Sequence, residues 1–175
     1  MTVNTNKDTL PEKILEQVLS SFKNSASQPR LRHGLNTYKM TCDLLTVFSK
    51  KYSFNKSAEV RLAALLHDYT KEFTPEQHLT ILKKIKIPSE DFSLPGLWHG
   101  WTGAYSVEKE FGIISPYILN LIRFHPTGHK NFDLGGLILF ISDFCEDGRI
   151  HAGVRTIRRI AFKAVSYTHL TLPTK

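Results

Sequence analysis

Apolar residues recur three and four positions apart along most of the chain, which is the spacing of one face of an α-helix. Ile14, Val18 and Phe22 show this spacing first, after Pro11, a residue that suits a first helical turn. The segment 31–48 carries apolar residues on two faces, a pattern typical of a helix that is buried on several sides. The pattern therefore predicts an amphipathic helix followed by a central one.

Polar residues, prolines and glycines mark the ends of the helices that follow. Ser57 is placed to cap a third helix, Thr74 and Gln77 form a capping box, and Gly112 suits a helix end. Prolines mark a loop over 88–96. No segment alternates with a period of two, so we predict an all-α fold, a bundle of about seven helices. These later helices are expected from the cap at Ser57 through Leu66 into His67-Asp68, and at 75–85, 99–110, 116–124 and 134–144.

The composition of the chain narrows the class of protein further. The 175 residues and 20.0 kDa suit one compact domain, in which 41% of the residues are hydrophobic and 22% are charged. The cysteines, Cys42 and Cys145, are too few for a disulfide scaffold. No apolar run approaches the ~20 residues that cross a membrane, and the polar opening stretch lacks the apolar centre of a signal peptide. We therefore expect a cytoplasmic protein with no membrane partner.

The helical pattern changes abruptly near the C-terminus. Ile157, Ile160 and Ala161 keep the spacing of a last helix, but residues 166–175 abandon it. The string resembles a translated sequencing adapter, so we interpret 166–175 as a non-native tail. On this interpretation residues 1–165 are a single domain that is truncated within its last helix.

Lysine and arginine outnumber the acids by 23 to 16, which gives a net charge of +7 and a pI near 9.4. This balance suits a nucleic-acid binder, an enzyme that handles phosphorylated small molecules, or an ordinary solvated surface. Basic residues cluster at 83–86 and at 155–163, without the interleaved aromatic residues of a platform for single strands. We therefore expect no nucleic-acid partner.

His67 and Asp68 end an Ala- and Leu-rich helical segment, in which side chains are expected to be buried. A buried imidazole or carboxylate is costly unless it is paired or binds a metal, so the two residues suggest ligands for one cation. The alternative is a helix end at which a half-exposed histidine interacts with the last carbonyl groups.

Four more residues have comparable positions. His33 lies on an apolar side of the central helix, and Asp143 interrupts an apolar run, while His99 and His125 stand at helix ends. Each of them is also explained as an ordinary core or surface group. Together they offer nitrogen and oxygen donors on separate helices, which suit iron, manganese or zinc more than calcium. Three further histidines have polar surroundings and are expected at the surface: His78, His129 and His151.

The order of His33, His67-Asp68 and Asp143 resembles the HD superfamily of metal-dependent phosphohydrolases. Within it, the chain is similar to the YqeK group of bacterial symmetrical bis(5′-nucleosyl)-tetraphosphatases. Five ordered blocks between about residues 28 and 160 carry this similarity, at 63–72, 95–104, 111–113, 125–128 and 141–149.

The resemblance implies an HD-domain helical bundle around a buried metal site. It also implies that a metal-activated water cleaves diadenosine tetraphosphate symmetrically into two ADP molecules. The implied cofactor is one iron ion, with manganese or another divalent metal as alternatives and a second metal near His99 and His125 as an open question. Asp68 and Lys71 would be catalytic, and the implied metal ligands are His33, His67, Asp68 and Asp143. The residues implied in substrate binding are His33, Asp68, Lys71, His99, His125, Pro126, Asp143 and Arg149.

Two other interpretations stay open: an HD phosphohydrolase for another nucleotide, and a non-catalytic module that senses a metal or a nucleotide. A homodimer also stays open. The chain departs from the family pattern at two places. Pro126 stands where the family usually has a threonine, and Glu146 and Asp147 stand where the family usually has a proline nearby. We expect these two acids to weaken the binding of an anionic substrate.

Overall fold

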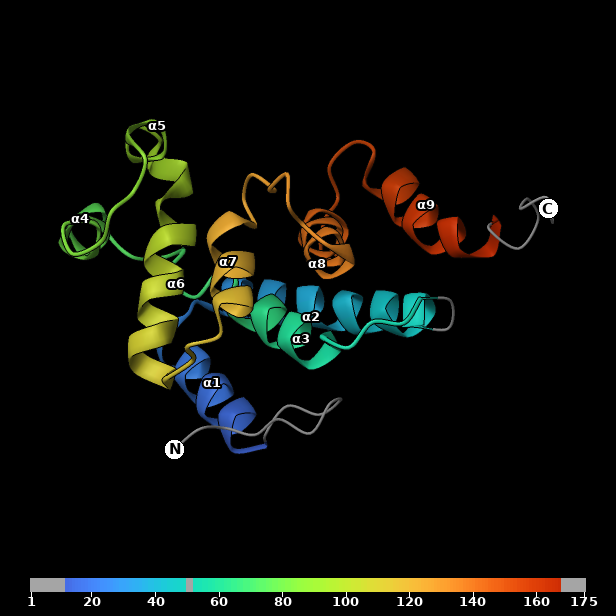
Figure 1. Ribbon diagram of the computed structural model, residues 1–175, viewed down its shortest axis with the longest axis horizontal. Helices are drawn as coiled ribbons and strands as arrows, with labels where there is room; N and C mark the ends of the chain where they lie inside the picture. The colour runs from blue at the N-terminus through green and yellow to red at the C-terminus, as the bar shows by residue number, and fades with distance from the viewer. Residues whose placement is uncertain (1–11, 50–51, 168–175) are drawn as a thin grey trace.

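The computed structural model describes residues 12–49 and 52–167, and all regular secondary structure in this part of the chain is helical (Figure 1). This part holds nine α-helices and one short 3-10 helix, η1, and none of its residues lies in a strand. The prediction of an all-α fold is therefore confirmed. In chain order the elements are α1 (Glu12–Ser25), α2 (Gln28–Ser49), α3 (Ser57–Leu66), α4 (Pro75–Leu82), α5 (Ser89–Phe92), η1 (Pro95–Leu97), α6 (Trp98–Phe111), α7 (Pro116–Phe124), α8 (Leu134–Cys145) and α9 (Val154–Tyr167).

Helix α3 forms the centre of the fold, and eight of its residues are buried. It packs against α2, α7 and α8, while α6 lies along α7 and contacts α4 (Figure 1). Leu44, Leu66, Ile122 and Leu139 come from four different helices and are fully buried in one core. Burying such a side chain contributes about 1.5–3 kcal/mol, so this core holds the four helices together.

Several helix ends follow the local signals in the sequence. The capping box at Thr74 is present, Gly112 ends α6 with a φ of 65°, and the Ser115 hydroxyl accepts a hydrogen bond from the third residue of α7. The prediction for Ser57 is wrong, because the cap position of α3 is Lys56 and no side chain bonds there. Ser57 is itself buried, so packing rather than capping decides its place.

Other boundaries differ from the predicted ones. Helix α2 begins at Gln28 rather than at residue 31, because Pro29 fits a first helical turn, where its missing N–H is not needed. The segment 88–96, predicted as a loop, contains α5 and most of η1. Helix α9 continues to Tyr167, two residues into the predicted tail. Pro11 and residues 168–175 lie outside the described part of the chain.

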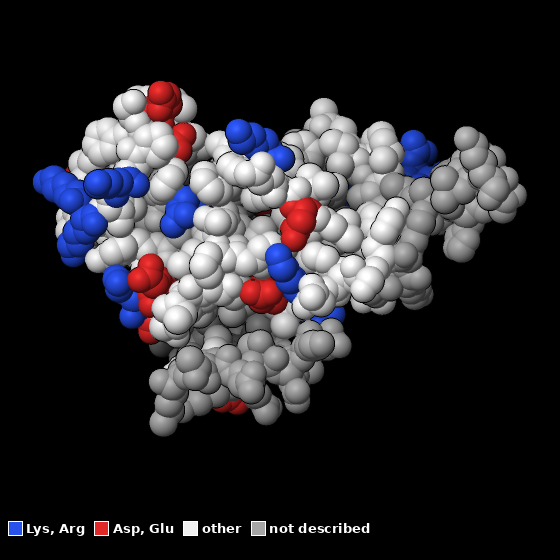
Figure 2. Space-filling model, in the orientation of Figure 1, with Lys and Arg blue, Asp and Glu red and all other residues white. Residues whose placement is uncertain are grey.

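Charged side chains of both signs are spread over the face shown in Figure 2, with a group of basic side chains at the end where α4 lies. Lys83, Lys84 and Lys86 are exposed directly after this helix. Among the described helices, none is long and apolar enough to cross a membrane.

Helices α6 and α7 approach each other so closely that only glycine fits at position 100. A Cβ atom there would lie 2.4 Å from the backbone oxygen of Arg123. We expect Gly100→Ala to lower the free energy of unfolding by about 1–3 kcal/mol, because two backbones must separate. Urea unfolding measures this change. Gly96→Ala is the matched control, since nothing lies within 4 Å of its added Cβ atom, and an equal loss in both variants would contradict the explanation.

Candidate metal centre

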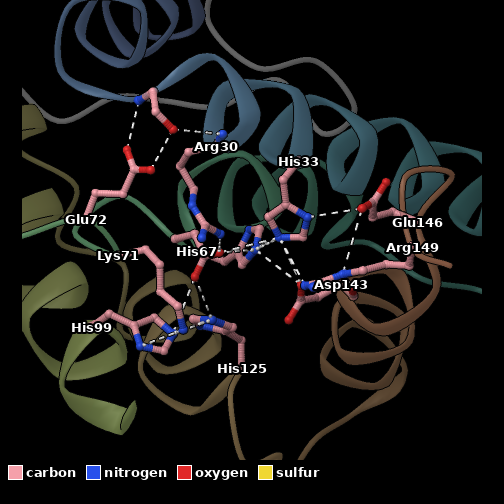
Figure 3. Close-up of polar contacts among 12 residues, drawn as sticks. Arg30, His33, His67, Lys71, Glu72, His99, His125, Asp143, Glu146 and Arg149 are labelled. Carbon is pink, nitrogen blue, oxygen red and sulfur yellow. Dashed lines mark hydrogen bonds and ion pairs between the residues drawn. The ribbon is translucent and has the colours of Figure 1, made fainter. Parts of the chain in front are cut away.

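Six imidazole and carboxylate side chains meet where α2 and the first turn of α6 approach the last turn of α8 and the C-terminal ends of α3 and α7 (Figure 3). Helix α3 ends at Leu66, and the backbone then turns, with hydrogen bonds from Tyr69 N–H to Leu66 and from Lys71 N–H to Asp68. This turn buries two consecutive polar residues, as the Ala- and Leu-rich pattern suggested. The six side chains are those of His33, His67, Asp68, His99, His125 and Asp143.

The first group of ligand atoms contains the Nε2 atoms of His33 and His67 and one oxygen each of Asp68 and Asp143. The two Nε2 atoms lie 3.2 Å apart. Asp68 Oδ2 lies 3.4 Å from His33 Nε2 and 3.5 Å from His67 Nε2. Asp143 Oδ1 lies 3.1 Å and 3.6 Å from the same two nitrogens. The structure thus brings together all four residues of the implied ligand set.

The second group shares Asp68 through its other oxygen. Asp68 Oδ1 lies 3.4 Å from His99 Nε2 and 3.4 Å from His125 Nε2. These two nitrogens lie 3.1 Å apart, and both rings are buried. The two groups therefore meet at one carboxylate, which has an oxygen facing each of them.

Backbone carbonyl groups orient two of the imidazole rings. His67 and His125 are the C-cap residues of α3 and α7. Nδ1–H of His67 donates to the carbonyl of Ala64 at 2.7 Å, and Nδ1–H of His125 donates to that of Ile122 at 2.7 Å. Each hydrogen bond places the ring proton on Nδ1, so the lone pair of Nε2 points into the cluster.

Glu146 orients the third ring, a role that the sequence did not indicate. Its side chain is buried, and Oε1 lies 3.2 Å from Nδ1 of His33, while Oε2 accepts from Gly148 N–H at 2.5 Å. Asp147, by contrast, is exposed and pairs with Lys39 at 3.4 Å. The carboxylate of Glu146 thus turns to a histidine, whereas that of Asp147 is exposed, and a weaker binding of an anionic substrate stays a prediction for both acids.

The pKa shifts of the histidines differ between the two ligand groups. Burial opposes ionisation of Asp68 and Asp143, but the histidines around them hold both pKa values well below the usual range. Burial also opposes the charge of His33, yet hydrogen bonds to Asp143 and Asp68 raise its pKa to about 9. Burial, together with the neighbouring His125, lowers the pKa of His99 to about 3. At neutral pH the carboxylates are thus ionised, and a cation must displace a proton from His33.

These donor sets fit the divalent metal that the resemblance to the HD superfamily implies. Imidazole and carboxylate ligands lie about 2.0–2.2 Å from a bound ion, so neighbouring ligand atoms on one ion lie about 3.0–3.4 Å apart. The separations within the two groups are 3.1–3.6 Å. The donors are nitrogen and oxygen, on buried or half-buried residues that approach from several elements, and such donors suit a divalent transition metal.

Basic side chains lie on both sides of the cluster. Lys71 Nζ lies 3.2 Å from Nε2 of His99. Arg149 Nη2 donates to Asp143 Oδ1 at 2.9 Å, and the guanidinium of Arg30 contacts Oδ2 of Asp68. Arg30 was not a predicted site residue, although its place one helical turn before His33 could have indicated it. Pro126 follows His125 in the turn after α7 and is half-buried.

The three histidines expected at the surface differ in their exposure. His129 and His151 are exposed, as predicted. His78 is buried instead, with Nδ1 2.8 Å from the Thr102 hydroxyl oxygen, because its polar neighbours lie on the other face of α4. It is 24 residues from that partner, so the local sequence did not reveal the contact.

The fold and the cluster define the chain as an HD-superfamily hydrolase. Its structure is similar to a crystal structure of a predicted HD superfamily hydrolase involved in NAD metabolism from Clostridium acetobutylicum. The TM-score is 0.77 at 27% sequence identity, and the match covers 86% of this chain and 78% of the other. No protein-family model matches the chain.

Curated relatives narrow this class to one family. The symmetrical bis(5′-nucleosyl)-tetraphosphatase of Bacillus subtilis is 30% identical over 148 residues, covering 83% of this chain and 76% of the relative. That of Halalkalibacterium halodurans is 32% identical over 144 residues, covering 81% and 74%. That of Staphylococcus aureus is 26% identical over 149 residues, covering 85% and 74%. The chain belongs to the symmetrical bis(5′-nucleosyl)-tetraphosphatase family.

Protonation of His33 predicts how the stability of the metal-free protein depends on pH. The folded state raises the pKa of His33 from 6.5 to about 9, so the stabilisation is complete below pH 6.5 and is lost as the pH rises through about 9. We expect urea unfolding to show a loss of about 1–2 kcal/mol between about pH 7 and about pH 9.5. His33→Asn should show a smaller loss, and the same loss in both proteins would argue against His33 as its source.

Proposed function

We propose that the protein hydrolyses diadenosine tetraphosphate symmetrically to two molecules of ADP. The observation that carries this proposal is the pair of ligand groups that share Asp68, flanked by Lys71 and Arg149. This arrangement offers places for divalent cations beside basic groups that bind phosphate oxygens. The names of the three curated relatives support the same reaction.

We also propose which residues hold the metal. The first group, made of His33, His67, Asp68 and Asp143, would hold one divalent ion. The second, made of Asp68, His99 and His125, would hold another, so that Asp68 would belong to both ligand sets. We propose iron, with manganese as the alternative, because mixed imidazole and carboxylate donors suit these metals.

The reaction adds water across a phosphoanhydride bond. The water oxygen bonds to one of the two central phosphorus atoms, the bridging oxygen leaves with the other ADP, and the two water protons pass to the new terminal phosphates or to the solvent. A divalent ion at this site supplies Lewis acidity toward a phosphoryl oxygen and lowers the pKa of bound water. Lys71 and Arg149 would donate hydrogen bonds to the remaining phosphoryl oxygens and stabilise the charge that builds up on them. Pro126 would line the edge of the site next to His125.

Product analysis tests the proposed reaction. The protein is incubated with ferrous iron and diadenosine tetraphosphate without oxygen, and the nucleotides are separated by anion-exchange chromatography. ADP as the sole product is expected. A mixture of AMP and ATP would overturn symmetrical cleavage, and no product from folded, metal-loaded protein would overturn the proposed substrate.

Replacing one proposed ligand tests the metal assignment. We expect His67→Ala to lower the bound metal and to reduce turnover by more than about 100-fold, since even residues that only orient a ligand contribute 10–100-fold. Metal analysis and initial rates measure the two effects. His151→Ala is the control, because it removes an exposed histidine. Full activity and metal content in His67→Ala would refute the assignment.

Glu146 provides a test of how His33 is oriented. Glu146→Ala removes the carboxylate that accepts from Nδ1–H of His33, so we expect the affinity for the divalent ion to fall by about 10–100-fold. Competition with a chelating dye measures this affinity. Asp147→Ala is the matched control, because it removes the neighbouring acid from an exposed position. Equal affinities in the two variants would show that Glu146 does not orient the ligand.

A further inference from the structure

Three of the four histidines in the two ligand groups are oriented by a hydrogen-bond acceptor at Nδ1, and His99 is the exception. Backbone carbonyl groups accept from Nδ1–H of His67 and His125, and a carboxylate faces Nδ1 of His33. Toward Nδ1 of His99, the described residues offer only the ammonium group of Lys71, at 3.3 Å, which cannot accept a hydrogen bond. The direction of this ring therefore depends on how its backbone is held.

A buried chain of hydrogen bonds holds the backbone of His99. The Thr70 hydroxyl donates to the carbonyl of His99 at 3.1 Å and lies 2.9 Å from the hydroxyl oxygen of Thr102. The Thr102 oxygen lies 2.8 Å from Nδ1 of His78 and 3.0 Å from the carbonyl oxygen of Trp98. All three side chains of the chain are buried. The chain thus joins α4, the first turns of α6 and the turn that follows α3.

The number of hydrogens in this chain determines the tautomer of His78. Burial lowers the pKa of His78, so its ring is neutral at neutral pH and carries one N–H group. With that proton on Nδ1, three hydrogens serve the four contacts, namely this one and those of the two hydroxyls. With the proton on Nε2, Thr102 would have to donate to His78 and could not donate to Thr70. The Nδ1–H group of His78 therefore leaves both hydroxyls free to donate toward α6.

We propose that His78 is a positioning residue for the second ligand group. Through Thr102 and Thr70 it fixes the carbonyl of His99, and thereby the direction of the imidazole. That ring lies against the ring of His125 (Figure 3). The inference rests on the proposed function, because it concerns the divalent ion that this group would hold. The rings of the first group have acceptors of their own, so we expect His78 to affect the binding of one ion rather than of both.

Titration of the metal-free protein with Mn²⁺, followed by the electron paramagnetic resonance signal of the free ion, tests this inference without turnover. We expect the unchanged protein to bind two ions, and His125→Ala identifies the step of the second group, from which it removes a ligand. His78→Leu removes the donor, so the Kd of this step should rise about tenfold or more while the other Kd stays constant. His78→Asn, whose amide N–H replaces Nδ1–H, should keep both values.

Further variants make the test specific to the hydrogen-bonded chain. Thr102→Val removes the hydroxyl that His78 contacts and should weaken the same step. Combining it with His78→Leu should add little, because both changes break one chain. Thr80→Val is the matched control, since its exposed hydroxyl donates within α4, to the carbonyl of Glu76 at 2.8 Å, and both Kd values should stay unchanged. Urea unfolding checks that each variant is folded during the titration.

The outcomes separate this inference from the proposed function. Unchanged Kd values in both His78→Leu and Thr102→Val would overturn it and leave symmetrical cleavage standing. An equal loss in His78→Leu and His78→Asn, or in both binding steps, would overturn it too, because packing would then be the cause. Binding of a single ion by the unchanged protein would also overturn it.

A selective loss that His78→Asn restores supports the inference. It does so even if the unchanged protein yields no ADP from the dinucleotide, a result that overturns only the proposed substrate. If His78→Leu does not fold, the two Kd values of Thr102→Val decide, because this variant breaks the same contact from its other side.

Discussion

One buried carboxylate, that of Asp68, determines how the helices around the site are arranged. An ionised carboxylate in a protein interior costs several kcal/mol unless nearby groups compensate it. The compensation comes from separate elements, namely α2, the end of α3, α6 and the end of α7. Satisfying a single charge therefore fixes the mutual positions of four elements and brings their ligand atoms together. The groups that contact this carboxylate are Arg30, His33, His67, His99 and His125.

The parts of the site that the sequence predicted are those that break a local pattern. His67-Asp68 ends an apolar helix and Asp143 interrupts another. The free-energy cost of burying these polar side chains can therefore be inferred from the sequence alone. The contact of Glu146 with a histidine was not predicted, because Glu146 stands beside Asp147 and two adjacent acids look alike in a sequence. Only the partner, His33, which lies 113 residues away, determines which of them turns inward. Pairing at such a distance leaves no trace in the local spacing.

The fold shows the same division between local and distant causes. The caps at Thr74 and Ser115 depend on hydrogen bonds that span three residues, and both were predictable. Ser57 has the same chemistry but is buried between packed helices, so tertiary contacts override its capping preference. Gly100 is explained only by the backbone of Arg123, which another helix brings close. Local chemistry thus predicts where helices stop, whereas packing decides which of the residues there face the core.

The ends of α3 and α7 show why this fold favours a cation site. Carbonyl groups in the last turn of a helix lack intrahelical partners, and they carry a partial negative charge. His67 and His125, each in the C-cap position, use such a carbonyl to bind their Nδ1–H groups. This hydrogen bond satisfies the helix end and leaves Nε2 free to face Asp68. Two helix ends that converge on one carboxylate therefore combine lone pairs, negative charge and partial negative charge in one place. A divalent cation complements all three, so the chemistry of the site follows from the way in which its helices end.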